Sequence, residues 1–302
     1  MTKTEHRKFR KILRMGRRET VGAVQPGDYI AVYEKLDGAN ASFIVDDDKI
    51  RAFSRNLELD VDNTLRGFLD FALKQDASKL RANYRYFGEW LVPHKVDYGE
   101  HGGDFYLFDV YNEDTTKYEP IDVVVAEAFR LGLKIAPILY LGNFKDYAHL
   151  ESLIGRSAYA KVGGDNGEGI VVKNLTREAP YLKLVSESFR EVSNARAPKD
   201  PGDLAAERAF VDATVNEARV DKHLRKLIDE GLAPEFPTLQ DMGVILKNLG
   251  RNITEDILEE EGDQLPEGVD IAVVTKSVGK VAPKLLRQII EQDELSRFQE
   301  AI

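Results

Sequence analysis

The chain has 302 residues, 43% of them hydrophobic, so it is long enough for one large domain or two ordinary ones, and disorder is not expected. It contains no cysteine, which excludes disulfides, thiolate nucleophiles and cysteine-based zinc sites. The net charge of −10 disfavours broad nonspecific binding to nucleic acid. No apolar run approaches the ~20 residues that span a bilayer, and no apolar signal segment follows the polar N-terminus. We therefore expect a cytoplasmic protein without a membrane partner.

Charge is unevenly distributed along the chain. Residues 1–18 hold eight Lys and Arg against Glu5 alone, whereas from Ala195 onward 14 Lys and Arg stand against 22 Asp and Glu. A polyanionic partner is therefore expected to meet a local basic groove and not the whole surface. A solvated basic helix is an equally good interpretation of the N-terminal segment.

The hydrophobic and aromatic patterns predict an α+β domain over residues 1–194. The expected elements are, in chain order, a strand at 28–34, a hairpin at 41–54, a helix at 62–81, strands at 84–91 and 104–111, helices at 120–131 and 144–154, and strands at 169–173 and 181–185. The stretch 195–203, rich in proline and charge, is a predicted linker. Beyond it, helices are expected at 204–230, 239–249, 253–261 and 273–298. Residues 195–302 should then form an acidic, all-helical C-terminal domain.

The tetrapeptide Lys35-Leu36-Asp37-Gly38 places a lysine between a strand and a tight turn. A lysine amine has an ordinary pKa of ~10.4 and must be deprotonated to attack phosphorus, so such a site should lower the pKa of Lys35 by desolvation or nearby positive charge. Gly38 permits a sharp turn. Taken alone, the tetrapeptide is better interpreted as an exposed β-turn.

Five further motifs follow in order, and they change that interpretation. They are Ser54-Arg55-Asn56, Phe87-Gly88-Glu89-Trp90, Phe108-Asp109-Val110, Glu168-Gly169-Ile170-Val171-Val172-Lys173 and Tyr181-Leu182-Lys183-Leu184-Val185-Ser186. Together with the Lys35 tetrapeptide, the set resembles the covalent nucleotidyltransferase superfamily of ATP-dependent DNA ligases, RNA ligases and capping enzymes. The resemblance covers roughly residues 30–191. It implies a ligase-type adenylyltransferase domain with antiparallel sheets and flanking helices, in which Lys35 takes up AMP.

The residue types fit the chemistry that the resemblance implies. Glutamates offer hard oxygen ligands for Mg²⁺, with Mn²⁺ as a substitute; cationic groups stabilise phosphate charge; and an aromatic face can stack on a purine. The resemblance implies catalytic roles for Lys35, Lys173 and Lys183, and a metal site at Glu89 and Glu168. It implies nucleotide binding by Glu34, Lys35, Asn40, Arg55, Glu89, Phe108, Glu168, Lys173 and Lys183.

Purely structural interpretations of the same residues are also open. Glu89 and Glu168 could be solvated charges at strand ends, and Phe108 could simply pack in a core. His94 and His101 lie in a loop between matched motifs, where ordinary surface histidines are expected because no third ligand stands at a suitable spacing.

Three features favour the RNA-ligase-2-like branch. Asn40 stands where DNA ligases usually have arginine, the two aromatic strands resemble that branch, and the tail is helical where DNA ligases and capping enzymes carry an OB-fold. Two features do not fit the pattern of that branch. The last motif has one lysine, Lys183, where many members have two, and Ser54-Arg55-Asn56 also resembles DNA ligases.

The sequence therefore predicts an ATP-dependent RNA ligase. It would seal 5′-phosphate and 3′-hydroxyl ends through a lysyl-AMP and an adenylylated 5′ end, with ATP and RNA or RNA-containing strand ends as partners. The alternatives are an ATP-dependent DNA ligase and a non-catalytic protein that binds nucleotide or nucleic-acid ends.

Overall fold

The computed structural model describes residues 5–161, 167–190, 206–265 and 269–300. The chain divides into two compact units, Met1–Glu187 and Ser188–Ile302, and each is described by itself. The predicted linker at 195–203 lies outside the described residues, so the predicted domain boundary between residues 194 and 195 stays a prediction. Within the described residues, no helix is both long and apolar enough to cross a membrane.

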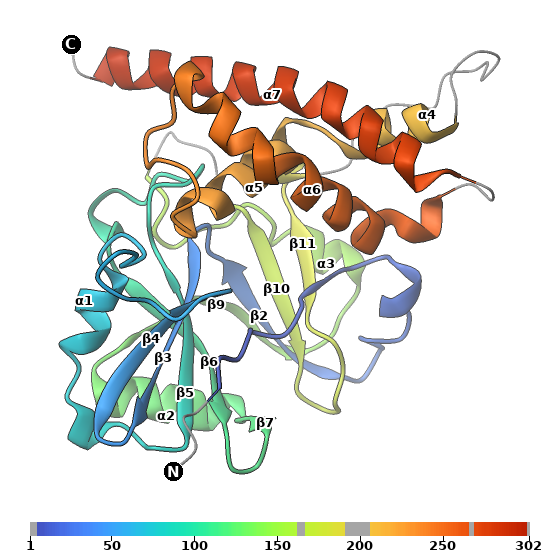
Figure 1. The fold of residues 1–302 in the computed structure, drawn as a ribbon. Helices are drawn as coiled ribbons and strands as arrows, with labels where there is room; N and C mark the ends of the chain where they lie inside the picture. Colours follow the sequence, from blue (N-terminus) through green and yellow to red (C-terminus); the bar gives the residue numbers. More distant parts are fainter. Residues whose placement is uncertain (1–4, 162–166, 191–205, 266–268, 301–302) are drawn as a thin grey trace. The chain divides into compact units, whose positions relative to one another are not determined.

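The first unit is built on two mostly antiparallel sheets (Figure 1). The first sheet has the order β1 (Leu13–Arg14), β11 (Leu182–Val185), β10 (Gly169–Asn174), β2 (Tyr29–Lys35) and β9 (Ile138–Asn143). The second has the order β4 (Lys49–Ser54), β3 (Ala39–Asp46), β5 (Tyr84–Trp90), β6 (Phe105–Asn112) and β7 (Lys117–Tyr118), with β8 (Lys134–Ile135) beside β6. Together with the helices described below, these sheets confirm the predicted α+β class.

Each sheet buries one face in its own hydrophobic core. In the first sheet, alternate residues such as Ile30 and Val172 face a core that includes Leu150 of α3 (Tyr147–Glu151). In the second sheet, Phe43 and Leu107 face α1 (Phe68–Leu73) and α2 (Ile121–Leu131). The opposite faces of the two sheets are left to carry the polar residues of the motifs.

The helix predicted over residues 62–81 is much shorter in the structure. Leu65 and Arg66 have φ of 49° and 51°, and Gly67 has φ of 91°. Left-handed residues cannot continue a right-handed helix, so α1 begins only at Phe68. A separate 3-10 turn, Ala77–Lys79, is capped by the Asp76 side chain. The helix predicted at 144–154 is likewise reduced to α3, and β9 was not predicted.

The second unit contains α4 (Ala206–Thr214), α5 (Glu217–Asp229), α6 (Met242–Glu261) and α7 (Ile271–Glu300). The helix predicted over residues 204–230 is divided because the Asn216 side chain accepts a hydrogen bond from Arg219 N (3.0 Å) and starts a new helix. The two helices predicted at 239–249 and 253–261 are one, because Gly250 lies inside α6. Burial of Leu249 and Ile253 on either side outweighs the ~1 kcal/mol that a helical glycine costs.

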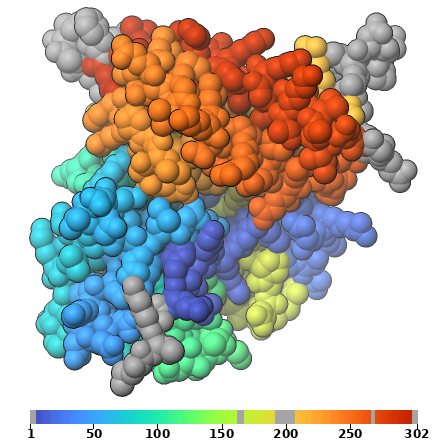
Figure 2. All heavy atoms as spheres, in the orientation of Figure 1, coloured from blue at the N-terminus to red at the C-terminus, as the bar shows by residue number. Residues whose placement is uncertain are grey.

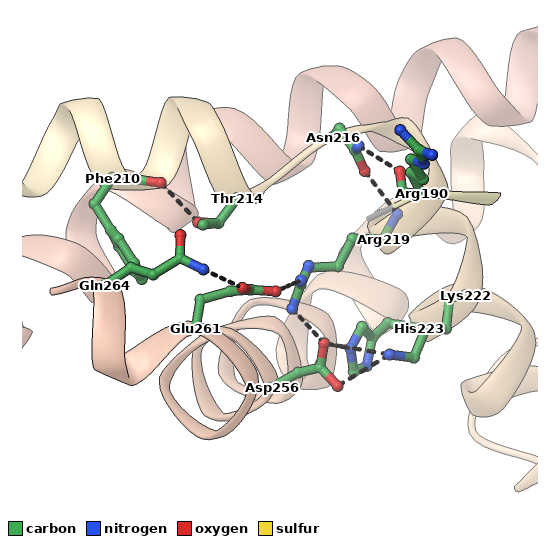
Figure 3. Close-up of polar contacts among 10 residues, drawn as sticks. All are labelled: Arg190, Phe210, Thr214, Asn216, Arg219, Lys222, His223, Asp256, Glu261 and Gln264. Atoms are coloured by element: carbon green, nitrogen blue, oxygen red, sulfur yellow. Dashed lines mark hydrogen bonds and ion pairs between the residues drawn. The ribbon is translucent and has the colours of Figure 1, made fainter. Parts of the chain in front are cut away.

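A buried ionic network joins α5 to α6 (Figure 3). The fully buried Arg219 guanidinium donates to Asp256 Oδ2 (2.5 Å) and to Glu261 Oε1 (2.9 Å). Lys222 Nζ lies 3.1 Å from Asp256 Oδ1, and His223 Nε2 lies 3.3 Å from Asp256 Oδ2. Burial lowers the pKa of His223 to about 4, against the opposing effect of Asp256. His223 is therefore neutral in the folded chain at pH 7.

The low pKa of His223 should make the second unit sensitive to mild acid. An unfolded histidine has a pKa of ~6.5, so the unfolded state binds more protons than the folded state between pH 6.5 and about 4. We expect His223 to remove up to roughly 3 kcal/mol of stability as the pH falls through this window. Urea unfolding followed by far-ultraviolet circular dichroism at pH 7, 6 and 5 measures the loss. In His223→Gln, the free energy of unfolding should depend less on pH. If it falls equally with pH in the wild type and the variant, His223 is not the group responsible.

Candidate active site

Lys35 ends β2 and pairs in register with Gly169 of β10. Its Nζ lies 2.5 Å from Glu168 Oε2, and both side chains are largely buried. A Cβ at position 169 would fall 2.1 Å from the Leu184 carbonyl oxygen, so the close approach of β10 and β11 requires glycine there. Two residues from distant motifs, predicted as nucleophile and metal ligand, thus meet in an ion pair.

The turn after Lys35 is held against β5. Gly38 N donates to Glu89 Oε1 (3.2 Å), and a Cβ at position 38 would meet the Trp90 carbonyl oxygen at 2.5 Å. Leu36 is only 5% exposed, so the interpretation of this tetrapeptide as an exposed turn is wrong. The contact also brings the Glu89 carboxylate to the turn that carries Lys35.

The Asp37 carboxylate anchors the same turn to the loop after β5. Asp37 Oδ2 accepts hydrogen bonds from Lys95 N (2.8 Å) and Val96 N (2.9 Å), and Asp37 N donates to the Tyr98 hydroxyl (2.8 Å). His94 Nδ1 lies 3.4 Å from Asp37 Oδ1, and its side chain is 9% exposed. The prediction of a surface histidine was therefore wrong for His94. No local pattern could reveal this contact, which joins residues 57 positions apart in the chain.

The electrostatics around Lys35 differ from the sequence-based expectation. Burial alone would lower the pKa of Lys35, but the carboxylates of Glu168, Glu89 and Asp37 outweigh burial and raise it. Burial and the neighbouring charge of Glu168 raise the pKa of Glu89 to about 8. Burial also raises the pKa of Glu168, although Lys35 opposes the shift. In this arrangement Lys35 is a protonated amine in a carboxylate-rich site.

Lys173 lies on the same face of the first sheet as Lys35, but four residues along β10 from Gly169, or about 13 Å. Its Nζ donates to Asp109 Oδ2 (2.8 Å) and to the Phe108 carbonyl oxygen (2.6 Å). Burial lowers the pKa of Lys173 and raises that of Asp109. The pair joins the two sheets next to the half-buried Phe108. The predicted role of Lys173 towards phosphates stays a prediction.

The remaining predicted residues occupy different parts of the first unit. Asn40 of β3 lies opposite Glu89 of β5, and Lys183 of β11 is close enough for its charge to lower the pKa of Glu168. Arg55 directly follows β4 and is half-buried. Glu34 is buried, and its carboxylate accepts hydrogen bonds from Ala158 N (2.9 Å) and from the Ser157 hydroxyl.

The structure therefore gathers Lys35, Glu89 and Glu168 at one end of the site, with Asn40 and Lys183 close by. Within the described residues, no group of three or more His, Cys, Asp or Glu side chains could hold a metal by itself. Mg²⁺ is commonly held by one or two carboxylates together with substrate phosphates and water. Two largely buried carboxylates with raised pKa values fit a divalent cation that shares its ligands with a bound nucleotide.

The two sheets, the lysine at the end of β2 and the two glutamates beside it define a protein of the covalent nucleotidyltransferase class. The model of one family, described as RNA ligase, matches residues 28–185, just over half of the chain. The chain belongs to the RNA ligase family.

The similarity of the chain to solved structures is weaker. An archaeal ATP-dependent RNA ligase is 18% identical, with a TM-score of 0.48 over 93% of this chain and 65% of the other. The Naegleria gruberi RNA ligase with PPi is 21% identical, with a TM-score of 0.44 over 62% and 58%. A mutant of the Naegleria enzyme with ATP and Mn is 20% identical, with a TM-score of 0.41 over 59% and 57%. The chain thus spans less than two thirds of the length of these proteins, and no curated protein matches it.

Proposed function

We propose that this chain is an ATP-dependent RNA ligase that forms a covalent AMP adduct on Lys35. The observation that carries the proposal is the contact between Lys35 Nζ and Glu168, with Glu89 bonded to the turn that follows the lysine. Membership of the RNA ligase family supports the reaction class. We further propose that residues 1–194 form the adenylation domain and residues 195–302 a helical C-terminal domain.

In the first step, Lys35 Nζ attacks the α-phosphorus of ATP. A phosphorus–nitrogen bond forms, the bond to the pyrophosphate oxygen breaks and pyrophosphate leaves, and the amine releases its proton to water. Because the carboxylates raise the pKa of Lys35, the contact between Lys35 and Glu168 must weaken when the nucleotide binds. The amine can then be neutral and turn towards phosphorus.

Glu89 and Glu168 would hold Mg²⁺ or Mn²⁺ together with nucleotide phosphates. A bound divalent cation would neutralise their charge and stabilise the negative charge that develops on the phosphate oxygens. Lys183 and Arg55 would add positive charge around the phosphates. Phe108 offers an aromatic face for the purine, and the Lys173–Asp109 ion pair holds the strand that carries Phe108.

In the later steps, AMP passes from Lys35 to a 5′-phosphate, and a 3′-hydroxyl then displaces AMP to seal the strand. The lysyl-AMP intermediate thus splits one difficult displacement into easier steps. Asn40, opposite Glu89, is a neutral donor and acceptor that suits a 2′-hydroxyl or a phosphate. This position supports an RNA end as the substrate and membership of the RNA-ligase-2-like branch.

A panel of nicked duplexes tests the substrate. We expect the wild-type chain, with Mg²⁺ and ATP, to seal nicks whose 3′-hydroxyl strand ends in ribonucleotides faster than all-DNA nicks. Preference for all-DNA ends would assign the chain to the DNA ligases. Label from GTP and not from ATP would indicate a capping-type enzyme, and binding of ATP without any covalent label would indicate a non-catalytic protein.

A further inference from the structure

The N-terminal strap, which we define as residues 5–15, contacts both sheets of the first unit. It appears in dark blue at the surface beside the green residues around β7 (Figure 2). On the second sheet, Arg85 Nη2 donates to the Glu5 carbonyl oxygen (2.8 Å). On the first sheet, Leu13 N donates to the Tyr181 carbonyl oxygen (2.8 Å), and Met15 N donates to the Lys183 carbonyl oxygen (3.0 Å). The strap therefore ties β11, which carries Lys183, to the aromatic strands of the second sheet.

Cations of the strap lie against aromatic rings. The Arg7 guanidinium lies 4.1 Å from the centre of the Tyr111 ring and forms an ion pair with Glu113 (3.1 Å). The Arg10 guanidinium lies 4.7 Å and 4.6 Å from the ring centres of Tyr118 and Tyr181. These two arginines of the basic segment are therefore used to hold the strap in place.

Phe9 is the buried centre of the strap, with 4% of its surface exposed. Its ring centre lies 4.8 Å from that of Phe108 and 5.2 Å from that of Phe87. It also lies 5.5 Å from the Tyr118 ring and 6.2 Å from the Tyr181 ring. A residue near the start of the chain thus packs directly on Phe108, the side chain proposed above to stack on the purine.

A second set of contacts holds the backbone of Phe108 from the first sheet. Lys173 Nζ donates to the Phe108 carbonyl oxygen, and the Tyr181 hydroxyl lies 3.4 Å from Asp109 Oδ1. These contacts hold the carbonyl group of Phe108 and the side chain of Asp109, and neither of them involves the ring of Phe108. Among the described aromatic residues, Phe9 is the ring in contact with that of Phe108.

We propose that the N-terminal strap is part of the nucleotide site and that Phe9 is a positioning residue, which fixes the ring of Phe108 for stacking on the base. The inference rests on the proposed function, because it takes Phe108 as the base-stacking residue. Without Phe9, the Phe108 ring loses a buried aromatic partner and gains room to turn away from the base. Lys35 lies beside Gly169, about 13 Å along β10 from the Lys173 that bonds to Phe108, so the part of the site around Lys35 and Glu168 should be untouched.

Equilibrium calorimetry with two probes tests the proposal. The first probe, α,β-methylene-ATP, carries the base but cannot transfer AMP; the second, inorganic tripolyphosphate, has no base. Both are titrated with Mg²⁺ into the full chain. We expect Phe9→Ala to weaken binding of the nucleotide about five- to tenfold and to leave binding of tripolyphosphate within about twofold. The nucleotide affinity of Phe9→Leu, whose side chain refills most of the cavity, should lie between those of the wild type and Phe9→Ala.

Two matched variants serve as controls. Phe68→Ala removes an equally buried ring that packs on Phe71 and Trp90, and it should lower the melting temperature without changing nucleotide affinity. Lys8→Ala removes an exposed charge next to Phe9 and should change neither the melting temperature nor the nucleotide affinity. Unchanged nucleotide affinity in Phe9→Ala would overturn the proposal. An equal loss of affinity for the nucleotide and for tripolyphosphate would overturn it as well.

A covalent-labelling assay on the same proteins separates this inference from the proposed function. With ATP and Mg²⁺, Phe9→Ala should need about five- to tenfold more ATP for half-maximal lysyl-AMP formation and reach nearly the wild-type maximal rate. If the wild type forms no lysyl-AMP but nucleotide affinity still depends on Phe9, the proposed function fails and the role of Phe9 stands. A lower maximal rate with an unchanged requirement for ATP would count against the role of Phe9.

Discussion

Replacing Lys35 with alanine is expected to reduce lysyl-AMP formation by roughly a thousandfold or more, because the attacking amine is removed. Lys35→Arg should fail as well, since a guanidinium stays protonated and cannot attack phosphorus. The measurement is the rate at which radioactive AMP from α-labelled ATP becomes acid-stable on the denatured polypeptide.

The same variants should retain sealing of an RNA end that is already adenylylated. Joining of such an end no longer needs the amine of Lys35 as a nucleophile, whereas joining of a 5′-phosphate end does. Lys8→Ala, an exposed lysine outside the site, is the control and should behave as wild type in both reactions. Undiminished label on Lys35→Ala would rule out Lys35 as the nucleophile.

Replacing Arg219 with methionine is expected to cost the second unit about 3–5 kcal/mol of unfolding free energy. The change removes the ion pair between Arg219 and the fully buried Glu261 carboxylate, and it takes one of the two cations, Arg219 and Lys222, away from Asp256. Urea unfolding followed by far-ultraviolet circular dichroism reports mainly on the helices of the second unit. The single tryptophan, Trp90, lies in the first unit, and its fluorescence should show an unchanged transition there.

A double variant separates the ionic interaction from the loss of packing. Arg219→Met with Glu261→Met replaces the buried pair by apolar side chains and should recover a large part of the lost stability. A double variant less stable than Arg219→Met, or a single variant that loses under about 1 kcal/mol, would contradict the account of this network.

The strands around the active site could be predicted closely from local patterns. The strand expected at 28–34 is β2 (Tyr29–Lys35), and the strand expected at 169–173 is β10 (Gly169–Asn174). Both carry short runs rich in β-branched residues, which favour strands, and β2 also carries the aromatic residues Tyr29 and Tyr33. The ordered motifs also indicated which residues belong near Lys35, and the structure brings Glu89 and Glu168 to it.

Other features depend on contacts that a local pattern does not contain. The left-handed conformations of Leu65 and Arg66 prevent the expected long helix from starting before Phe68, although both residues are ordinary helix formers. The raised pKa of Lys35 results from three carboxylates that only the folded chain assembles. Lys173 was matched to a motif, but its ion pair with Asp109 joins residues 64 positions apart. The charge of the N-terminal segment left contact with a polyanion and a solvated basic helix equally open, whereas Phe9 of this segment packs on an aromatic cluster.

The central claim is that Lys35 itself carries AMP, and mapping the adduct on the wild-type chain tests it most directly. The protein is incubated with ATP and Mg²⁺, denatured in acid and digested, and the peptides are sequenced by mass spectrometry. We predict one adenylylated lysine, Lys35, within the peptide that includes Leu36-Asp37-Gly38. An adduct on Lys173, Lys183 or any other residue, or no adduct at all, would contradict the account.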